Sequence, residues 1–455
     1  MTLPTAFQEQ MRPILGIEYD DFVAALQASP STSIRLHPWK KTSTISEEKV
    51  PWHEAAYYLK ERPIFTLNPS FHAGAYYVQE ASSMFVAEAL QQAINLSQPL
   101  QVLDLCAAPG GKSTLLQSLI SEDSCLISNE VIKSRNYILQ ENLAKWGATN
   151  TIITRHDPKD FERLGGLFDV VVVDAPCSGE GLFRKDSEAA AQWSPGLVEL
   201  CAARQKRILY SAQQLLKKDG LLLYCTCTYN WKENEDNVEW LLDNYGLGGV
   251  QLTVPKEWGV KETAAGSDGY GYRFFPHRVR GEGFFLSVLR KVSDIRDIVS
   301  MKKHPKLSML SKKAIDQFDS FIQSSDDLLF LTTDNQEVSI IPKAMEEVAN
   351  IVSHQLSRHR LGTTVGTIKA KNIVPSAALA LSRYVHSDLP TMNLNRLDAL
   401  RFLKKENIKM DVSGRGWHLA TYQNLNLGWA KVLPNRVNNY YPKEWRIRMP
   451  IEPTN

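Results

Sequence analysis

The stretch VLDLCAAPGGK, residues 102–112, decides the fold of this chain. Its first part is apolar apart from Asp104, which is typical of a buried β-strand, and the small residues after it allow a tight turn that opens a helix. A ligand can approach the backbone of such a turn closely. Residues 102–112 therefore predict a strand, a ligand-binding turn and a helix in succession.

The same order of elements continues along the chain. Strand-like runs occupy 101–105, 125–130, 151–154, 170–174 and 220–225, and helical patterns occupy 79–94, 113–120, 134–146 and 197–216. Strands that alternate with helices predict an α/β fold with a doubly wound parallel sheet. The last helix is expected to end at Asp219-Gly220, a common stop signal. Runs at 271–275 and 283–289 predict an antiparallel hairpin that closes the sheet.

The composition is that of an ordinary globular protein. The chain has 455 residues, of which 43% are hydrophobic and 22% charged, and this excludes disordered and collagen-like classes. At roughly 100–200 residues per domain, the length indicates two to four domains. No apolar run approaches the ~18 residues of a membrane span, and the N-terminus lacks the pattern of a signal peptide. We therefore expect a cytoplasmic monomer with no membrane partner.

Charge and cysteine are unevenly distributed. Residues 301–455 carry 22 basic and 14 acidic side chains, whereas residues 1–300 carry 30 basic and 36 acidic ones, so the C-terminal part favours a polyanionic partner. All six cysteines lie between 106 and 227 without a C-x-x-C pair, so we predict neither a disulfide framework nor a metal site. Cys125, Cys201 and Cys225 are expected to pack in the core.

Acidic residues follow the next two strands. Glu130 lies 20 residues beyond Gly110 at the end of a strand, and Asp157 follows the third strand in the same way. Carboxylates at these places can accept hydrogen bonds from ribose hydroxyls, which predicts an adenosine-containing cofactor. The end of the first motif is also similar to a phosphate-binding P-loop, although that motif needs glycine at position 106, where this chain has Cys106. A nucleoside triphosphatase and a purely structural turn remain alternatives.

Two further motifs follow neighbouring strand-like runs. DAPCSGEG, residues 174–181, ends the run at 170–173, and YCTCT, residues 224–228, ends the next one. If the two strands are neighbours in the sheet, Cys177 and Cys227 lie on loops at the same edge, beside the cofactor crevice. Two thiols and a carboxylate would then face one site.

The motifs CAAPGGK, DAPCSGEG and CTCTYNWKENE together resemble the RNA 5-methylcytosine methyltransferases of the NSUN (Sun) family, and most of all its bacterial members that act on 16S ribosomal RNA. Segments 71–84 and 276–285 are also similar to the family, and the C-terminal stretch resembles its PUA-like RNA-binding domain. The resemblance implies a class I (Rossmann-like) methyltransferase domain, S-adenosylmethionine as cofactor and ribosomal RNA as partner. A transfer RNA cytosine-5 methyltransferase and a non-catalytic RNA-binding assembly factor remain open.

The resemblance also implies roles for particular residues. Cys227 would be the nucleophile, Cys177 would release the product, and Asp174 could hold the cytosine edge. Carbon 5 of cytosine is a poor nucleophile until a thiolate adds to carbon 6, which explains the need for covalent catalysis. The implied cofactor-binding residues are Cys106, Ala107, Ala108, Pro109, Gly110, Gly111, Lys112, Glu130, Asp157 and Asp174.

We expect five parts in the chain. These are an N-terminal RNA-binding lobe (1–75), the methyltransferase domain (76–292), a basic linker (293–313), an intermediate domain (314–385) and a PUA-like RNA-binding domain (386–455). Phe183, Arg184 and Lys185 are expected on an exposed loop, where the ring could stack on a base and the cations could contact phosphates. In the tail, the tryptophans and some of the tyrosines are expected to fill a small barrel core. The predicted phosphate contacts are Arg436, Lys443, Arg446 and Arg448.

Overall fold

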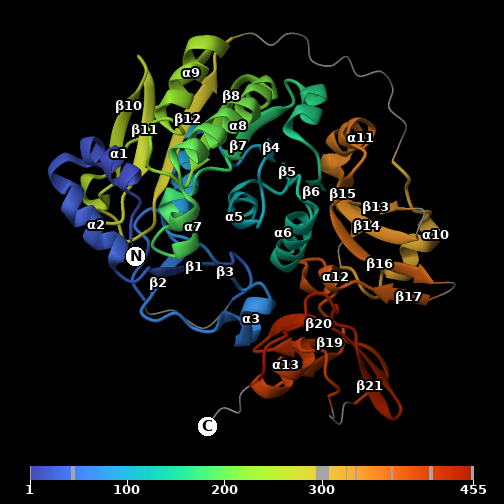
Figure 1. The fold of residues 1–455 in the computed structure, drawn as a ribbon. Coiled ribbons are helices and arrows are strands. Elements are labelled where there is room, and N and C mark those ends of the chain that lie inside the picture. Colours follow the sequence, from blue (N-terminus) through green and yellow to red (C-terminus); the bar gives the residue numbers. More distant parts are fainter. Residues whose placement is uncertain are drawn as a thin grey trace.

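The computed structural model describes residues 2–41, 47–293, 307–323, 325–333, 336–369, 372–408 and 413–451. Among them, the central element is a ten-stranded sheet with the order β10-β11-β12-β8-β7-β4-β5-β6-β15, in which β9 also pairs with β12 (Figure 1). The adjacent strands from β8 to β6 are parallel. They are β8 (Leu216–Thr226), β7 (Phe168–Asp174), β4 (Gln101–Asp104), β5 (Cys125–Asn129) and β6 (Thr151–Thr154). The predicted parallel sheet is confirmed.

Helices lie beside these strands, and those that begin at Phe85, Gly111, Lys133 and Pro195 coincide with the predicted helical patterns, whereas the other two were not predicted. The helices are α4 (Phe85–Ala93), α5 (Gly111–Leu119), α6 (Lys133–Trp146), α7 (Ser187–Gln192), α8 (Pro195–Gln214) and α9 (Glu235–Tyr245). Helix α8 begins where Ser194 Oγ accepts a hydrogen bond from the N–H of Leu197. The prediction that this helix ends at Asp219-Gly220 is wrong, because β8 already begins at Leu216 and Asp219 adopts a left-handed turn within it, with φ of 64°.

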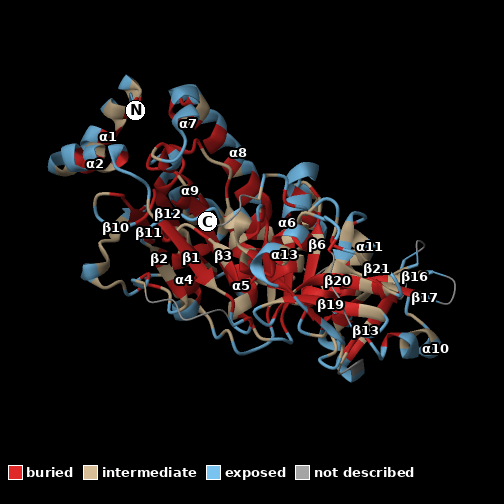
Figure 2. Cartoon of the chain, turned by 90° about the horizontal axis from the view of Figure 1, so that it is seen from below, coloured by how far each residue is buried: buried red, intermediate tan, exposed pale blue. Residues whose placement is uncertain are grey.

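Antiparallel strands extend the sheet at both sides. They are β9 (Leu247–Gly249), β10 (Lys261–Ala265), β11 (Gly269–Phe274) and β12 (Phe284–Lys291) on one side and β15 (His359–Leu361) on the other. The pairing of β11 with β12 confirms the predicted hairpin. Strand β15 was not predicted, and it places part of the expected 314–385 domain at the edge of the central sheet. Most residues of the central strands are buried, as the colours of Figure 2 show.

The N-terminal segment has two parts. Helices α1 (Thr5–Leu15) and α2 (Tyr19–Gln27) pack against the region after β7, where the rings of Phe7 and Phe183 lie 5.0 Å apart. A small antiparallel sheet with the order β2-β1-β3 follows, with the short helix α3 (Pro69–His72) beside it. Its strands are β1 (Thr32–Leu36), β2 (Ala56–Leu59) and β3 (Tyr76–Val78), so this sheet continues past residue 75.

Two further sheets form the C-terminal part. The first contains β13 (Leu328–Thr332), β14 (Glu337–Pro342), β16 (Thr363–Lys369) and β17 (Asn372–Pro375), with α10 (Lys312–Ile315), α11 (Glu346–Gln355) and α12 (Ala377–Leu381). The second contains β18 (Thr391–Asn393), β19 (Gly416–Tyr422), β20 (Leu425–Leu433) and β21 (Arg436–Asn439), with α13 (Arg396–Leu403). Both sheets contribute to one hydrophobic core, which includes Trp429 and Val338. Most of the predicted basic linker, residues 294–306, lies outside the described residues.

Candidate active site

The turn between β4 and α5 lies at the carboxyl edge of the parallel strands. Gly110 has a φ of 115°, a left-handed conformation that favours glycine, and α5 begins at the next residue. Asp104 at the end of β4 is fully buried, and its Oδ2 accepts a 2.7 Å hydrogen bond from Ser113 Oγ. Its Oδ1 is buried and has no hydrogen-bond partner among the described residues. Burial raises the pKa of Asp104 to about 7. We did not predict Asp104 as a site residue.

An ion pair joins the start of α5, directly after the turn at residues 105–110 (the cofactor turn), to the neighbouring strand β7. Lys112 Nζ, in the first turn of α5, lies 2.8 Å from Oδ2 of Asp174 at the end of β7. Burial alone would lower the pKa of Lys112, but the Asp174 carboxylate raises it above its usual value. The Asp174 side chain is 36% exposed, so it is still open to a ligand.

Glu130 directly follows β5, as predicted for a ribose-binding carboxylate. Its Oε1 accepts a 2.8 Å hydrogen bond from the N–H of Ile132, and its Oε2 lies 3.2 Å from Arg135 Nη1. Arg135 also donates a 2.7 Å hydrogen bond to the carbonyl of Ala108 in the cofactor turn. These contacts bring Glu130 and the turn together. Val131 is 52% exposed beside them, an apolar surface that sequence reasoning missed.

Asp157 lies at the same edge, three residues after β6. Its Oδ1 accepts a 3.1 Å hydrogen bond from the N–H of Lys159, and the carboxylate pairs with Arg207 Nη1 of α8 at 2.9 Å. The side chain is 39% exposed. The carboxylate is therefore held by protein groups on one side and accessible on the other.

The two predicted catalytic cysteines meet at the ends of β7 and β8. These strands pair in parallel, with Asp174 opposite Cys225. The loops that follow, 175–183 (the Cys177 loop) and 227–234 (the Cys227 loop), place Cys177 Sγ 2.8 Å from Cys227 Sγ, and both cysteines are free and half-buried. The hydrogen bond to Cys227 and burial raise the pKa of Cys177 well above its ordinary value. Cys177 therefore retains its proton at neutral pH.

The other cysteines do not join this pair. Cys125, Cys201 and Cys225 are buried, which confirms the prediction that they pack in the core. Burial raises the pKa of Cys106 in the cofactor turn, so its thiol is uncharged at neutral pH.

The expectation that Phe183, Arg184 and Lys185 form an exposed RNA-binding patch is wrong for the first two. Phe183 is only 1% exposed because α1 covers it, so it cannot stack on a base. The Arg184 side chain is 7% exposed and pairs with Glu282 at 2.9 Å. The Lys185 side chain is 33% exposed, with its Nζ 3.5 Å from the same carboxylate. The ring is buried in a hydrophobic lobe, and a buried acid binds the guanidinium.

The predicted tail cations lie on the surface. Arg436, Lys443, Arg446 and Arg448 are exposed, and none of them forms an ion pair with another described residue. Trp429 is buried and donates a 2.7 Å hydrogen bond from Nε1 to Ser376 O, which confirms that this aromatic residue belongs to the core.

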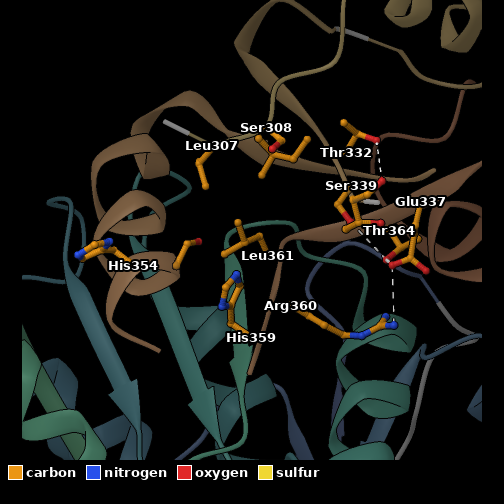
Figure 3. Close-up of a pocket in the computed structure, with 13 residues that line it drawn as sticks. Leu307, Ser308, Thr332, Glu337, Ser339, His354, His359, Arg360, Leu361 and Thr364 are labelled. Carbon is orange, nitrogen blue, oxygen red and sulfur yellow. Dashed lines mark hydrogen bonds and ion pairs between the residues drawn. The ribbon is translucent and has the colours of Figure 1, made fainter. Parts of the chain in front are cut away.

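Two cavities lie apart from the thiols. Figure 3 shows one of about 390 Å³, lined by residues such as Glu337, His359 and Arg360, and it contains no predicted site residue. A polar groove of about 730 Å³ lies between the N-terminal sheet and the loop before β12, where Lys60 and Arg62 line its wall. Arg278 and Arg280 also line it, so the cations of this basic groove come from two distant segments of the chain, and sequence reasoning missed it. Within the described ranges, none of the helices combines the length and apolar character of a membrane span.

Comparisons with known proteins cover nearly the whole length of the chain. Three family models match the chain. Residues 91–290 match the model described as "16S rRNA methyltransferase RsmB/F". Residues 3–81 match "N-terminal domain of 16S rRNA methyltransferase RsmF", and residues 389–447 match "Methyltransferase RsmF PUA domain". Ribosomal RNA small subunit methyltransferase F of Vibrio vulnificus strain YJ016 is 30% identical to the chain, with 97% of each covered. The protein of the same name from Salmonella arizonae is also 30% identical, with 97% of this chain and 96% of the relative covered.

Solved structures show the same fold. A methyltransferase homolog protein from Pyrococcus horikoshii is 26% identical, with a TM-score of 0.54 over 63% of this chain and 95% of that one. NSun6 from the same organism, solved with SFG, has a TM-score of 0.55 at 19% identity over 64% of this chain and 99% of that one. The predicted class I α/β methyltransferase fold with an N-terminal domain and a C-terminal PUA domain is therefore confirmed.

Proposed function

Since the chain belongs to the ribosomal RNA small subunit methyltransferase F family and is thus an RNA methyltransferase, we propose that it methylates carbon 5 of a cytosine in 16S ribosomal RNA. The methyl donor would be S-adenosylmethionine. One observation carries the proposal: Cys177 and Cys227 come from loops 50 residues apart in sequence, yet their sulfur atoms lie 2.8 Å apart at the carboxyl edge of the sheet. A protein that only binds RNA has no use for such a pair.

The residues of the carboxyl edge fit the methyl donor. Asp104 Oδ1 is buried without a described partner, and a carboxylate oxygen there can attract a cationic ligand. Glu130 and Asp157 would bind ribose and adenine groups, and the exposed side chain of Val131 offers an apolar surface to a base. When bound, S-adenosylmethionine supplies a methyl group activated by positive charge on sulfur.

Cys227 would begin the reaction on the base. Its thiolate adds to carbon 6, a sulfur–carbon bond forms, and the electron pair of the carbon 5–carbon 6 double bond moves so that carbon 5 becomes nucleophilic. Burial and the hydrogen bond with Cys227 raise the pKa of Cys177, so the thiolate of Cys177 is scarce at neutral pH. We therefore assign the role of nucleophile to Cys227.

Cys177 would end the reaction. After carbon 5 has been methylated, the thiolate of Cys177 takes the remaining proton from carbon 5, the double bond forms again, and the bond between carbon 6 and Cys227 breaks. Cys177 must first lose its own proton, and its raised pKa makes this form scarce at neutral pH. Release of the product should therefore speed up as the pH rises.

Asp174 would orient the cytosine. Its half-exposed carboxylate lies one residue before the Cys177 loop, and Lys112 fixes one of its oxygens at 2.8 Å. The other oxygen can accept a hydrogen bond from the amino group of the base or from a protonated N3. Charge that develops on the ring during addition would thereby be stabilised.

The RNA would be bound by two basic surfaces, one on the PUA domain and one in the groove beside the N-terminal sheet. We assign phosphate contacts to Arg436, Lys443, Arg446 and Arg448 in the PUA domain and to Lys60 and Arg62 in the basic groove. We expect the protein to act as a monomer in the cytoplasm. A cytosine of transfer RNA is the alternative substrate, and the exposed tail cations would serve it equally well.

The position of methylation can be tested directly with RNA that carries tritium on carbon 5 of its cytosines. Methylation at carbon 5 must expel this atom, so the wild-type protein with S-adenosylmethionine should release one tritium into water for each methyl group transferred. Transfer of methyl groups without release of tritium would contradict carbon 5 as the target. The same assay with 16S ribosomal RNA and with transfer RNA would show which of the two is the substrate.

A further inference from the structure

Hydrogen bonds join the Cys177 loop directly to the Cys227 loop. Gly181 N–H donates to Cys227 O at 2.9 Å, and the hydroxyls of Ser178 and Thr228 lie 3.0 Å apart. The loops approach so closely that a Cβ on Gly181 would lie 2.9 Å from Cys227 O. Their relative position is therefore set by contacts between the loops as well as by the pairing of β7 with β8.

Glu180 of the Cys177 loop holds the Cys227 loop. It is fully buried, and its Oε2 accepts a 2.8 Å hydrogen bond from the N–H of Tyr229, two residues after the nucleophile. Its Oε1 accepts from Gln10 Nε2 of α1, Trp193 Nε1 and Asn230 Nδ2 at 3.0, 3.1 and 3.0 Å. One of the two oxygens is thus reserved for the backbone of the Cys227 loop.

Glu233 of the Cys227 loop holds the Cys177 loop in the same way. It is fully buried, and its Oε2 accepts a 2.9 Å hydrogen bond from the N–H of Ser178, directly after Cys177. Gln205 Nε2 of α8 donates to the same oxygen at 2.8 Å and to the carbonyl of Pro176 at 3.1 Å. The residues on both sides of Cys177 are therefore fixed.

Asn230 connects the two carboxylates. Its Nδ2 lies 3.0 Å from Glu180 Oε1 and 2.7 Å from Glu233 Oε1, and its Oδ1 accepts from the N–H of Glu233 at 2.8 Å. We call Glu180, Glu233 and Asn230 the clasp. Two carboxylates in a buried place without a cation need such donors to be tolerated. The pairing of β7 with β8 already brings the two loops together. Buried charges are therefore not needed merely to connect the loops.

We propose that Glu180 and Glu233 are positioning residues of the proposed cytosine methylation, each of which fixes the loop of the other cysteine. This inference rests on the proposed function. Cys227 must reach carbon 6 and Cys177 must later reach the proton on carbon 5, so the two backbones must keep one spacing through both steps. Reactive groups need to be held within about 0.5 Å of their productive places.

The clasp also explains how the base can enter. Two sulfur atoms 2.8 Å apart leave no room for a ring between them, so the side chains of Cys177 and Cys227 must rotate when cytosine binds. The backbones need not move, because the neighbouring N–H groups of Tyr229 and Ser178 remain bound to Glu180 and Glu233. Thiol movement is thereby confined to side-chain rotation.

Each carboxylate binds the backbone of the loop that carries the other cysteine. Substitution of Glu180 and substitution of Glu233 should therefore have opposite effects on the amount of covalent adduct. In Glu180→Gln the amide carbonyl can take the place of Oε1 and accept from its three donors, so the hydrogen bond from Tyr229 N–H in the Cys227 loop is broken. The covalent adduct should then form about 10- to 100-fold more slowly, the usual cost of a displaced reactive group. Glu233→Met removes the acceptor of Ser178 N–H, so release should slow and the adduct should accumulate.

The adduct can be followed in quenched single-turnover reactions on denaturing gels. Asp169→Asn is the matched control, since this carboxylate lies at the opposite end of β7, where it accepts from Lys217 and the N–H of Gln101. Gln205→Met is a milder variant of the Cys177 side and should show the same accumulation to a smaller extent. Calorimetric binding of S-adenosylmethionine and the melting temperature report whether each variant is folded.

A second measurement does not depend on the methylation chemistry. Diamide takes the two thiol hydrogens and becomes a hydrazine, while a disulfide bond forms between Cys177 and Cys227. The rate of disulfide formation reports how often the two sulfur atoms meet. This rate can be measured by mass spectrometry of the linked peptides. Glu180→Gln and Glu233→Met should slow it several-fold, whereas Asp169→Asn should leave it unchanged.

Less adduct in Glu180→Gln together with more adduct in Glu233→Met supports the inference. Equal effects of both substitutions on adduct formation, or none, would overturn it and would leave the clasp as packing. If Cys177→Ala itself yields no adduct, the proposed function fails. The diamide rates alone then decide whether Glu180 and Glu233 position the two cysteines. Unchanged rates in both carboxylate variants would then overturn the positioning role.

Discussion

The cofactor half and the thiol half of the sheet edge are built in different ways. The cofactor half lies along a continuous part of the chain, where Asp104, Ser113, Glu130 and Arg135 contact one another or the turn between them. The thiol half joins two loops whose cysteines are 50 residues apart and holds them with buried carboxylates. Binding of the methyl donor and covalent chemistry should therefore be separable by mutation.

Of all the variants, Cys227→Ser should have the largest effect. We expect no detectable methylation, because a hydroxyl has too high a pKa to replace the thiolate as nucleophile. Binding of S-adenosylmethionine, measured by titration calorimetry, should stay close to that of the wild type, because Cys227 belongs to the other half. Substantial turnover by the variant would remove Cys227 from the role of nucleophile.

Glu130→Ala should have the converse effect. The variant loses the carboxylate that accepts from Ile132 N–H and pairs with Arg135, and with it the predicted ribose contact. We expect cofactor affinity to fall about tenfold, which is typical of one lost charge-assisted hydrogen bond. Diamide cross-linking of the two cysteines should be unaffected. An unchanged dissociation constant would exclude a ribose contact at this position.

The C-terminal cations should contribute neither to binding of the methyl donor nor to the chemistry of the two thiols. The triple variant Arg436→Ala, Lys443→Ala, Arg446→Ala should bind RNA several-fold more weakly, because its exposed cations have no carboxylate partner in the described chain. Each lost phosphate contact should flatten the slope of log affinity against log salt by about 0.7. If filter binding at several salt concentrations gives the wild-type slope, these side chains do not contact phosphates.

The last effect concerns stability rather than activity, and it arises from Asp104. Burial raises the pKa of this carboxyl from 3.8 to about 7, so the folded protein retains a proton there that the unfolded chain loses. Its contribution to stability therefore falls as the pH rises from about 4 to 7. Asp104→Asn has no such carboxyl and should not lose stability in this way. The melting temperature of the variant minus that of the wild type should therefore rise between about pH 4 and pH 7. A difference independent of pH would contradict the raised pKa.

The central sheet could be predicted because each strand and helix has its own periodic pattern. Cys106–Lys112 and Glu130 are found by local spacing, and the meeting of Cys177 with Cys227 follows once β7 and β8 are taken as neighbours. Strand β15 could not be predicted, because three residues carry no pattern and their partner β6 is far away in sequence.

The errors have a common physical origin. Phe183 and Arg184 look exposed in sequence, yet α1 covers the ring and Glu282 binds the guanidinium. Glu180 and Glu233 were not predicted as site residues, yet both are buried and accept backbone N–H groups. In each case the partner comes from a distant segment, so local composition gives no sign of burial.

In the proposed reaction Cys227 forms the covalent adduct and Cys177 releases the product, and Cys177→Ala separates these two steps. This variant should still form the bond between Cys227 and carbon 6 and accept a methyl group on carbon 5, but it should not release the RNA. A denaturing gel should show a protein–RNA adduct that disappears in the double variant Cys177→Ala, Cys227→Ser. Absence of the adduct in a folded Cys177→Ala protein that binds S-adenosylmethionine and RNA normally would contradict the account.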